Sequence, residues 1–122
     1  MSRTIIGRSE KIPSVHTALS RTANLTGHSE AEVKTSLKQF LKLIHAWQYW
    51  PVPMGRGKRT IDCFFCLQGR FFAVETKRSD VQEPTPAQDE VLRQIAAAHG
   101  GVCVENDVRL PNVKRMIHAV FG

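Results

Sequence analysis

An aspartate, a glutamate and a lysine stand where two predicted strands could bring them together. Residues 61–67 and 70–78 are strand-like runs separated by Gln68-Gly69, which is a typical hairpin signal. If Leu67 pairs with Arg70 across a two-residue turn, Asp62 lies directly opposite Glu75 on one face of the sheet, and Lys77 follows on that face. A three-residue turn would shift this register by one and separate the two carboxylates.

Two carboxylates that face each other on an apolar sheet need a shared proton or a cation. A hard divalent ion such as Mg²⁺ takes one or two protein carboxylates and completes its coordination with water and phosphate. Lys77 could stabilise the charge that grows on a phosphate or orient the attacking water. The pattern predicts a phosphodiester-cleaving site. The alternative is a Glu75–Lys77 ion pair at a strand end, because Glu-x-Lys is common by chance.

Two helical residues could complete such a site. Glu30 lies near the apolar face of a predicted helix and could reach the metal through water, or it could simply compensate the helix dipole. Gln88 lies on the inward face of a second predicted helix, but its spacing from Thr85 would also close a capping box. We weigh both interpretations for each residue.

The elements that must position these residues can be predicted from periodicity and end signals. Helices are expected over 30–45, 85–98 (stopped by Gly100-Gly101) and 113–121, and strands over 47–52, 61–67, 70–78 and 102–104. The order helix, strand, hairpin, helix, strand, helix predicts an α/β fold with a small mixed sheet. Both hairpin strands are apolar on both faces, as inner strands are.

Cys63 and Cys66 should point to opposite faces and belong to the core rather than to a zinc site.

Composition predicts a small intracellular protein that binds a polyanion. The chain has 122 residues and only three cysteines, and it has no apolar run of membrane-spanning length. Its net charge is +6 and its pI about 9.7, which favours nucleic acid as partner. Residues 1–28 carry half of that excess and form either a basic arm or a flexible leader, whereas 29–122 form the domain. The DNA-contact candidates are Arg56, Lys58, Arg59 and Arg78.

The same residues resemble the virus-type replication-repair nuclease (VRR-NUC) domain of the PD-(D/E)XK nuclease superfamily. The resemblance runs from about residue 29 to residue 104. It rests on Ser29-Glu30-Ala31-Glu32-Val33, the basic glycine loop before Asp62, Val74-Glu75-Thr76-Lys77, Thr85-Pro86-Ala87-Gln88 and His99-Gly100-Gly101. The family usually has Gly and Pro before the aspartate, where this chain has Thr60 and Ile61, and often a glutamine at the position of Lys34.

The resemblance implies a restriction-endonuclease-like core and a set of roles. Asp62, Glu75 and the backbone carbonyl of Thr76 would hold Mg²⁺ or Mn²⁺, and Lys77 would be the catalytic lysine. Glu30 and Gln88 would match the family's helical acid and glutamine. We expect a homodimeric endonuclease acting on branched DNA such as four-way junctions in the cytoplasm of a bacterial or phage-infected cell, with no membrane partner and no small-molecule cofactor. The alternatives are a nucleic-acid-binding module without turnover and a restriction-like or RNA-directed nuclease.

Overall fold

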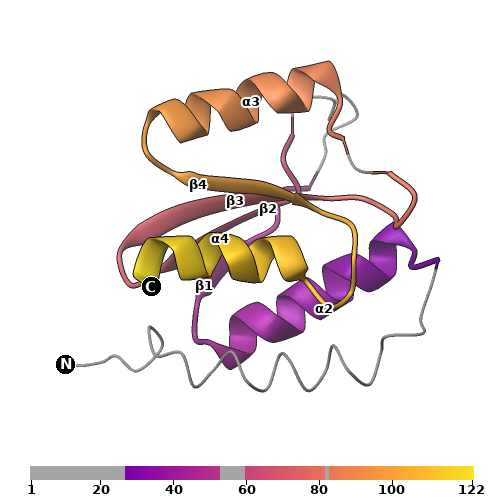
Figure 1. Cartoon of the computed structure of the whole chain (residues 1–122), viewed down its shortest axis with the longest axis horizontal. Coiled ribbons are helices and arrows are strands. Elements are labelled where there is room, and N and C mark those ends of the chain that lie inside the picture. The colour runs from indigo at the N-terminus through magenta and orange to yellow at the C-terminus, as the bar shows by residue number, and fades with distance from the viewer. Residues whose placement is uncertain (1–26, 53–59, 82) are drawn as a thin grey trace.

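A four-stranded mixed sheet with helices on both faces forms the part of the chain that the computed structural model describes, which is residues 27–52, 60–81 and 83–122. The elements follow in the order α2 (Glu30–Leu43), β1 (Trp47–Tyr49), β2 (Cys63–Leu67), β3 (Arg70–Thr76), α3 (Pro86–Ala97), β4 (Gly101–Glu105) and α4 (Pro111–Phe121). Helix α3 covers one face of the sheet, and α2 and α4 lie on the other (Figure 1). The predicted mixed α/β class is confirmed. Nearly all of the predicted basic arm, and the loop with Arg56, Lys58 and Arg59, lie outside the described residues.

Capping boxes begin the first two described helices, as the sequence predicts. At α2, Ser29 N–H donates to Glu32 Oε1 at 2.7 Å and Glu32 N–H donates to Ser29 Oγ at 3.1 Å. Thr85 and Gln88 exchange the equivalent pair of bonds at α3. Helix α2 ends at Leu43 rather than at His45, because His45 has a φ of 63° and so leaves the helical conformation.

The hairpin register is confirmed. Strands β2 and β3 pair antiparallel from Leu67 opposite Arg70 to Cys63 opposite Val74. Both turn residues, Gln68 and Gly69, have positive φ values, 50° and 80°, which is the conformation that a two-residue type I′ turn needs. Strand β1 pairs with the other side of β2, and β4 pairs parallel to β3 after the crossover through α3. The hairpin strands are therefore the two inner strands.

Strand β2 begins at Cys63, two residues later than predicted, because the chain changes orientation at Asp62. Ile61 packs with Ala73 and Leu92 on the α3 side of the sheet, whereas Cys63 packs in the cluster on the side of α2 and α4. Residues two apart in a regular strand share a face, so the alternation is broken between them. Lys77 lies just after the end of β3.

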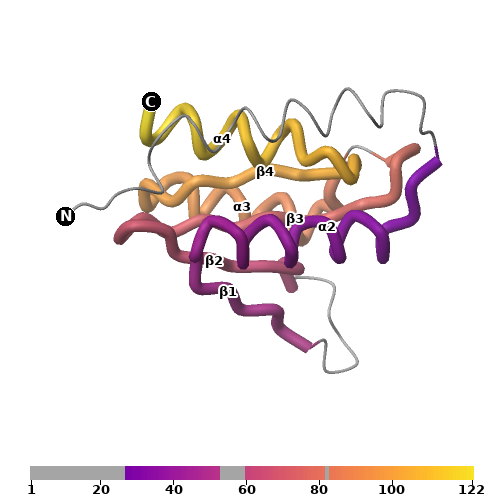
Figure 2. Tube along the Cα trace, turned by 90° about the horizontal axis from the view of Figure 1, so that it is seen from below, coloured from indigo at the N-terminus to yellow at the C-terminus, as the bar shows by residue number. Residues whose placement is uncertain are grey.

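The larger hydrophobic cluster fills the space between the sheet and helices α2 and α4. Its buried side chains include Leu37, Leu41, Phe65, Phe72, Val74, Val113 and Ile117. Helix α4 lies beside β4 and α2 lies nearer β2 and β1 (Figure 2). Cys63 is buried here as predicted, but the prediction that Cys66 is a core residue is wrong: Cys66 is exposed on the opposite face. None of the described helices is long and apolar enough to cross a membrane.

The two glycines after α3 are needed for space rather than for the left-handed conformation. The helix ends at Ala97, and it is His99 that takes a positive φ of 73°. A Cβ on Gly101 would lie 2.5 Å from Phe72 Cδ1, and one on Gly100 would lie 2.6 Å from Ile95 Cγ2. The Gly100-Gly101 pair therefore lets the chain pass close to α3 and β3 as it enters β4.

A buried glutamate supplies the N-terminal cap of α4. The residue before the helix, Leu110, makes no side-chain cap. Instead Glu105 Oε1 accepts hydrogen bonds from the N–H groups of Asn112 at 2.8 Å and Val113 at 2.9 Å. Burial raises the pKa of Glu105, although these N–H donors oppose the increase. The carboxylate satisfies backbone donors that every helix start leaves without an intrahelical partner.

Replacing Glu105 with Ala should lower the free energy of unfolding by about 2–4 kcal/mol, because two helix N–H groups would lose their acceptor. Urea denaturation of the variant measures this loss. The control is Glu90→Ala on the exposed side of α3, which should change stability by less than about 0.5 kcal/mol. Equal stability of the two variants would show that the carboxylate is not what caps α4.

Candidate active site

The predicted site residues converge at the end of β2 and β3 away from the hairpin turn. Asp62 precedes β2, Glu75 is near the end of β3 and Lys77 follows it. Gln88 is in the first turn of α3 and Glu30 is in the first turn of α2. The first turns of both helices lie at this end of the sheet (Figure 1). Parts of the chain that are distant in sequence therefore meet at one place.

Asp62 and Glu75 close the end of the β2–β3 ladder with their side chains. Asp62 N–H donates to Glu75 Oε1 at 3.1 Å. Thr76 donates to Asp62 Oδ2 twice, from its N–H at 3.0 Å and from its hydroxyl at 2.6 Å. Each carboxylate thus accepts a backbone N–H of the neighbouring strand where the regular pairing ends. Both side chains are fixed by these bonds, which is what a preorganised site requires.

The two carboxylates do not face each other in the way that a continued ladder would dictate. Asp62 turns toward the Thr76 hydroxyl and α2, whereas Glu75 turns toward α3. The prediction that the two side chains share one face of the sheet is therefore wrong. The reason is that the regular alternation of β2 begins only at Cys63, so it does not fix the direction of Asp62. They are still close enough that the charge of Asp62 acts on Glu75.

Glu75 is a buried acid with incomplete charge compensation. Its side chain is 2% exposed. Oε2 accepts a hydrogen bond from Gln88 Nε2 at 2.8 Å and lies 3.3 Å from Lys77 Nζ. Burial and the charge of Asp62 raise the pKa of Glu75 to about 7, and Lys77 only partly opposes them. At neutral pH an additional positive charge nearby would stabilise the ionised form of the Glu75 carboxyl group.

Gln88 closes the predicted capping box and also contacts two of the candidate site residues. Its Oε1 accepts from Thr85 N–H at 3.0 Å, as a capping box requires, and also from Lys77 Nζ at 3.1 Å. Its Nε2 donates to Glu75. The amide therefore bridges the lysine and the glutamate and holds the ammonium group of Lys77 beside Glu75. Lys77 retains 15% exposure, so its charge is accessible from one side.

Lys34 is a site residue that the functional prediction missed. Its Nζ lies 3.4 Å from Glu30 Oε2 and 3.6 Å from Asp62 Oδ1. Burial lowers the pKa of Lys34, but the nearby Asp62 and Glu30 carboxylates outweigh that effect and raise it. Glu30 thus contacts Asp62 through a lysine rather than directly. The i, i+4 spacing of Glu30 and Lys34 was the signal that could have identified this pair.

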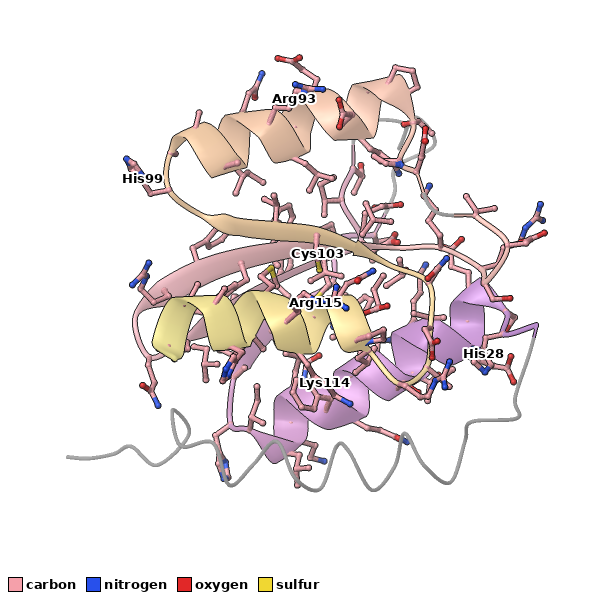
Figure 3. The ribbon with its side chains drawn as sticks, viewed as in Figure 1. His28, Arg93, His99, Cys103, Lys114 and Arg115 are labelled. Carbon is pink, nitrogen blue, oxygen red and sulfur yellow. The ribbon has the colours of Figure 1, made fainter. Side chains whose placement is uncertain are left out.

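Arg78, the one described member of the four predicted DNA contacts, lies on the surface near the site. It is exposed, and its Nε lies 2.7 Å from Asp80 Oδ1. An exposed ion pair of this kind contributes little to stability and can exchange partners readily. Arg93, another exposed arginine, projects from the outer side of α3 away from the sheet (Figure 3) and pairs with Asp89. Arg78 is therefore the better placed of these two arginines to contact a ligand at the site.

Asp62 and Glu75 are the ligand type that a hard divalent cation prefers, although their side chains turn toward different helices. Within residues 27–52, 60–81 and 83–122, no group of three or more His, Cys, Asp or Glu side chains could hold a metal ion. Two carboxylates are nevertheless a common protein contribution to a Mg²⁺ site. The burial of the Glu75 carboxylate close to the Asp62 carboxylate is what favours a cation here. Asp62 and Glu75 are the residues that would hold it, and the Thr76 carbonyl stays a predicted ligand.

In the presence of chelator, Glu75 should make the protein less stable as the pH rises from about 4.5 to about 7. The Glu75 carboxyl ionises near its ordinary pKa of 4.5 in the unfolded chain but only near 7 in the folded chain. Its contribution to the free energy of unfolding is therefore complete below pH 4.5 and is lost as the pH approaches 7. The difference corresponds to about 3 kcal/mol. Thermal unfolding across this pH range should show a smaller decline for Glu75→Gln than for the parent chain. A parallel decline in both proteins would contradict the buried, destabilised carboxylate.

The chain was compared with protein-family models, with curated proteins and with solved structures, and none of the three gave a match. The resemblance to the VRR-NUC domain thus stays a prediction that rests on the residues quoted above.

Proposed function

We propose that this protein is a Mg²⁺- or Mn²⁺-dependent endonuclease that hydrolyses phosphodiester bonds in DNA. The observation that carries the proposal is the buried Glu75, which is linked to Asp62 on one side and through Gln88 to Lys77 on the other. Carboxylates that can hold a divalent cation, with a lysine that can stabilise developing phosphate charge, suit metal-assisted phosphodiester hydrolysis. We further propose that the chain is a VRR-NUC domain of the PD-(D/E)XK superfamily, and that its mixed sheet is a restriction-endonuclease-like core.

Each site residue has a distinct task in this proposal. A divalent cation at Asp62 and Glu75 would supply Lewis-acid activation of the phosphodiester and of the attacking water. Lys77 places its positive charge beside the acids and would stabilise the charge that develops on the phosphate. Gln88 keeps the Lys77 ammonium and the Glu75 carboxylate in position. Lys34 and Glu30 adjust the charge around Asp62 from the side of α2.

The substrate proposal combines net charge with the family resemblance. A net charge of +6 favours DNA as the partner through its phosphates. From the resemblance we propose action on branched DNA, including four-way junctions, by a homodimer with a role in DNA repair. The setting proposed on the same ground is the cytoplasm of a bacterial or phage-infected cell.

One observation favours the alternative of a DNA-binding module without turnover. Lys34 stands where the VRR-NUC family often has a glutamine, and its ammonium group lies beside Asp62. A lysine there could satisfy the aspartate without a metal ion. Cleavage and binding must therefore be measured together on the same preparations.

Replacing Asp62 with Ala should reduce cleavage by roughly 10²-fold or more, because the substitution removes one of two metal-binding carboxylates. Affinity for DNA should persist, since phosphate contacts dominate it. The assay uses matched linear, flap and four-way substrates in Mg²⁺, in Mn²⁺ and in chelator, with circular dichroism to verify folding.

The matched control is Glu90→Ala, which removes an exposed acid of α3 that accepts a hydrogen bond from Gln94 and should leave cleavage unchanged. Full activity of Asp62→Ala would rule out the mechanism. Tight binding by the parent protein without cleavage in either metal would instead establish the binding module.

A further inference from the structure

A row of aromatic side chains is exposed on the sheet face that carries α3. Strand β1 places Trp47 and Tyr49 there with exposures of 68% and 53%, and β3 adds Phe71 at 49%. Phe64 and the exposed Cys66 lie between them on β2, opposite Tyr49 and Trp47 respectively. We call these five side chains the aromatic face.

Helix α3 leaves the aromatic face open because it packs over the other half of the sheet. Its main contacts are with β4 and β3, and it lies behind these strands when the sheet is seen from the side of α2 and α4 (Figure 2). The opposite surface of β1 is used differently: Gln48 donates to Lys38 O on α2, and Trp50 packs against the larger hydrophobic cluster. Alternation along β1 thus directs Trp47 and Tyr49 outward.

The rings of the aromatic face are ordered in pairs, in which Phe64 is partly buried and the other three rings are exposed. Trp47 and Tyr49 stack with their planes inclined by 15° and their centroids 6.3 Å apart. Phe64 and Phe71 stack with an interplanar angle of 25° at 5.7 Å. The rings therefore form two sets of nearly parallel plates on a rigid sheet. Large, flat and conformationally restricted surfaces of this kind suit stacking with planar ligands.

The aromatic face adjoins the candidate active site along the strands. Phe64, which pairs with Tyr49, is two residues from Asp62. Its other partner, Ala73, is two residues from Glu75. Within β3, the two residues from Ala73 to Glu75 span about 7 Å. A chain whose phosphate lay at Glu75 and Lys77 could therefore place a neighbouring base over Tyr49 and Phe64.

The size and charge of this surface favour bases over a second protein chain. At about 150–250 Å² for each aromatic side chain, the exposed parts of Trp47, Tyr49 and Phe71 amount to roughly 250–425 Å². A stable protein interface needs about 800 Å² from each partner. A net charge of +6 and the adjacent Lys77 instead complement a phosphate backbone.

We propose that the aromatic face is a stacking surface for the unpaired nucleobases of a DNA strand next to the cleavage site. This inference rests on the proposed function and deepens it. Bases are available for stacking only where strands separate, so such a surface would favour branched or splayed DNA over a continuous duplex. Branch selectivity would then originate in β1 and β2 of the catalytic domain.

The test measures DNA affinity in chelator, where no cleavage is needed. A fluorescently labelled 20-nucleotide single strand, a splayed duplex and a blunt duplex are titrated with the parent chain and with the double variant Trp47→Ala/Tyr49→Ala. The double variant should lose about fivefold to a hundredfold in affinity for the single strand and the splayed duplex. Its affinity for the blunt duplex should change less than twofold. Trp47→Phe should retain most of the affinity, because a stacking ring remains.

Leu43→Ala is the matched control, since Leu43 is an exposed apolar side chain at the end of α2 with 64% exposure. This variant should bind the single strand, the splayed duplex and the blunt duplex with the same affinity as the parent chain. An equal loss on all three DNAs, or no loss on any, would overturn the proposal. A change from dimer to monomer in sedimentation, together with a uniform loss, would identify the face as an interface between copies and overturn it as well.

Failure of the proposed function would give a different result. A parent chain that prefers single strands in chelator and loses that preference in the double variant, but cleaves nothing in Mg²⁺ or Mn²⁺, would refute the nuclease and retain the stacking surface. Asp62→Ala should keep the single-strand preference in chelator, since it leaves the aromatic rings intact.

Discussion

The hydrogen bonds that link Asp62, Glu75 and Thr76 where β2 and β3 cease to pair are the interaction on which the candidate site depends. They replace ladder bonds at the point where the chain turns away from the sheet, so the backbone donors there stay satisfied. The same bonds place two acids at one end of the sheet. Because Glu75 is buried there beside a second negative charge, its carboxyl is held at an energetic cost that a cation could relieve.

The residues at the starts of α2 and α3 both stabilise these helices and position the candidate site residues. Gln88 closes the capping box of α3 with its Oε1, and the same oxygen accepts a hydrogen bond from Lys77. Its Nε2 donates to Glu75 and so orients that carboxylate. Ser29 fixes the start of α2, which sets the positions of Glu30 and Lys34 relative to Asp62. A substitution in either cap would therefore change both local stability and the geometry of the acids. Glu105 shows the contrasting case of a buried acid whose carboxylate accepts backbone N–H groups at a helix start and in the loop before it.

The two faces of the sheet differ in how completely they are covered. The face toward α2 and α4 holds the larger hydrophobic cluster and is closed. The face toward α3 is covered over β4 and part of β3, while Trp47 and Tyr49 of β1 and Phe71 of β3 remain exposed. The candidate acids lie at the end of the sheet between these two environments. This arrangement leaves an exposed aromatic surface beside a charged site.

The sequence by itself determined the mixed α/β class, the starts of α2 and α3, and the register of the hairpin. These features follow from local rules of capping, periodicity and turn chemistry, which nearby residues specify completely. Only the tertiary structure decided the orientation of Asp62, the exposure of Cys66 and the capping of α4 by Glu105. Lys34 likewise joined the site only because α2 packs beside Asp62. Each of these depends on contacts between elements that are distant in the chain, and no local pattern encodes how far a helix extends over a sheet or where a ladder ends.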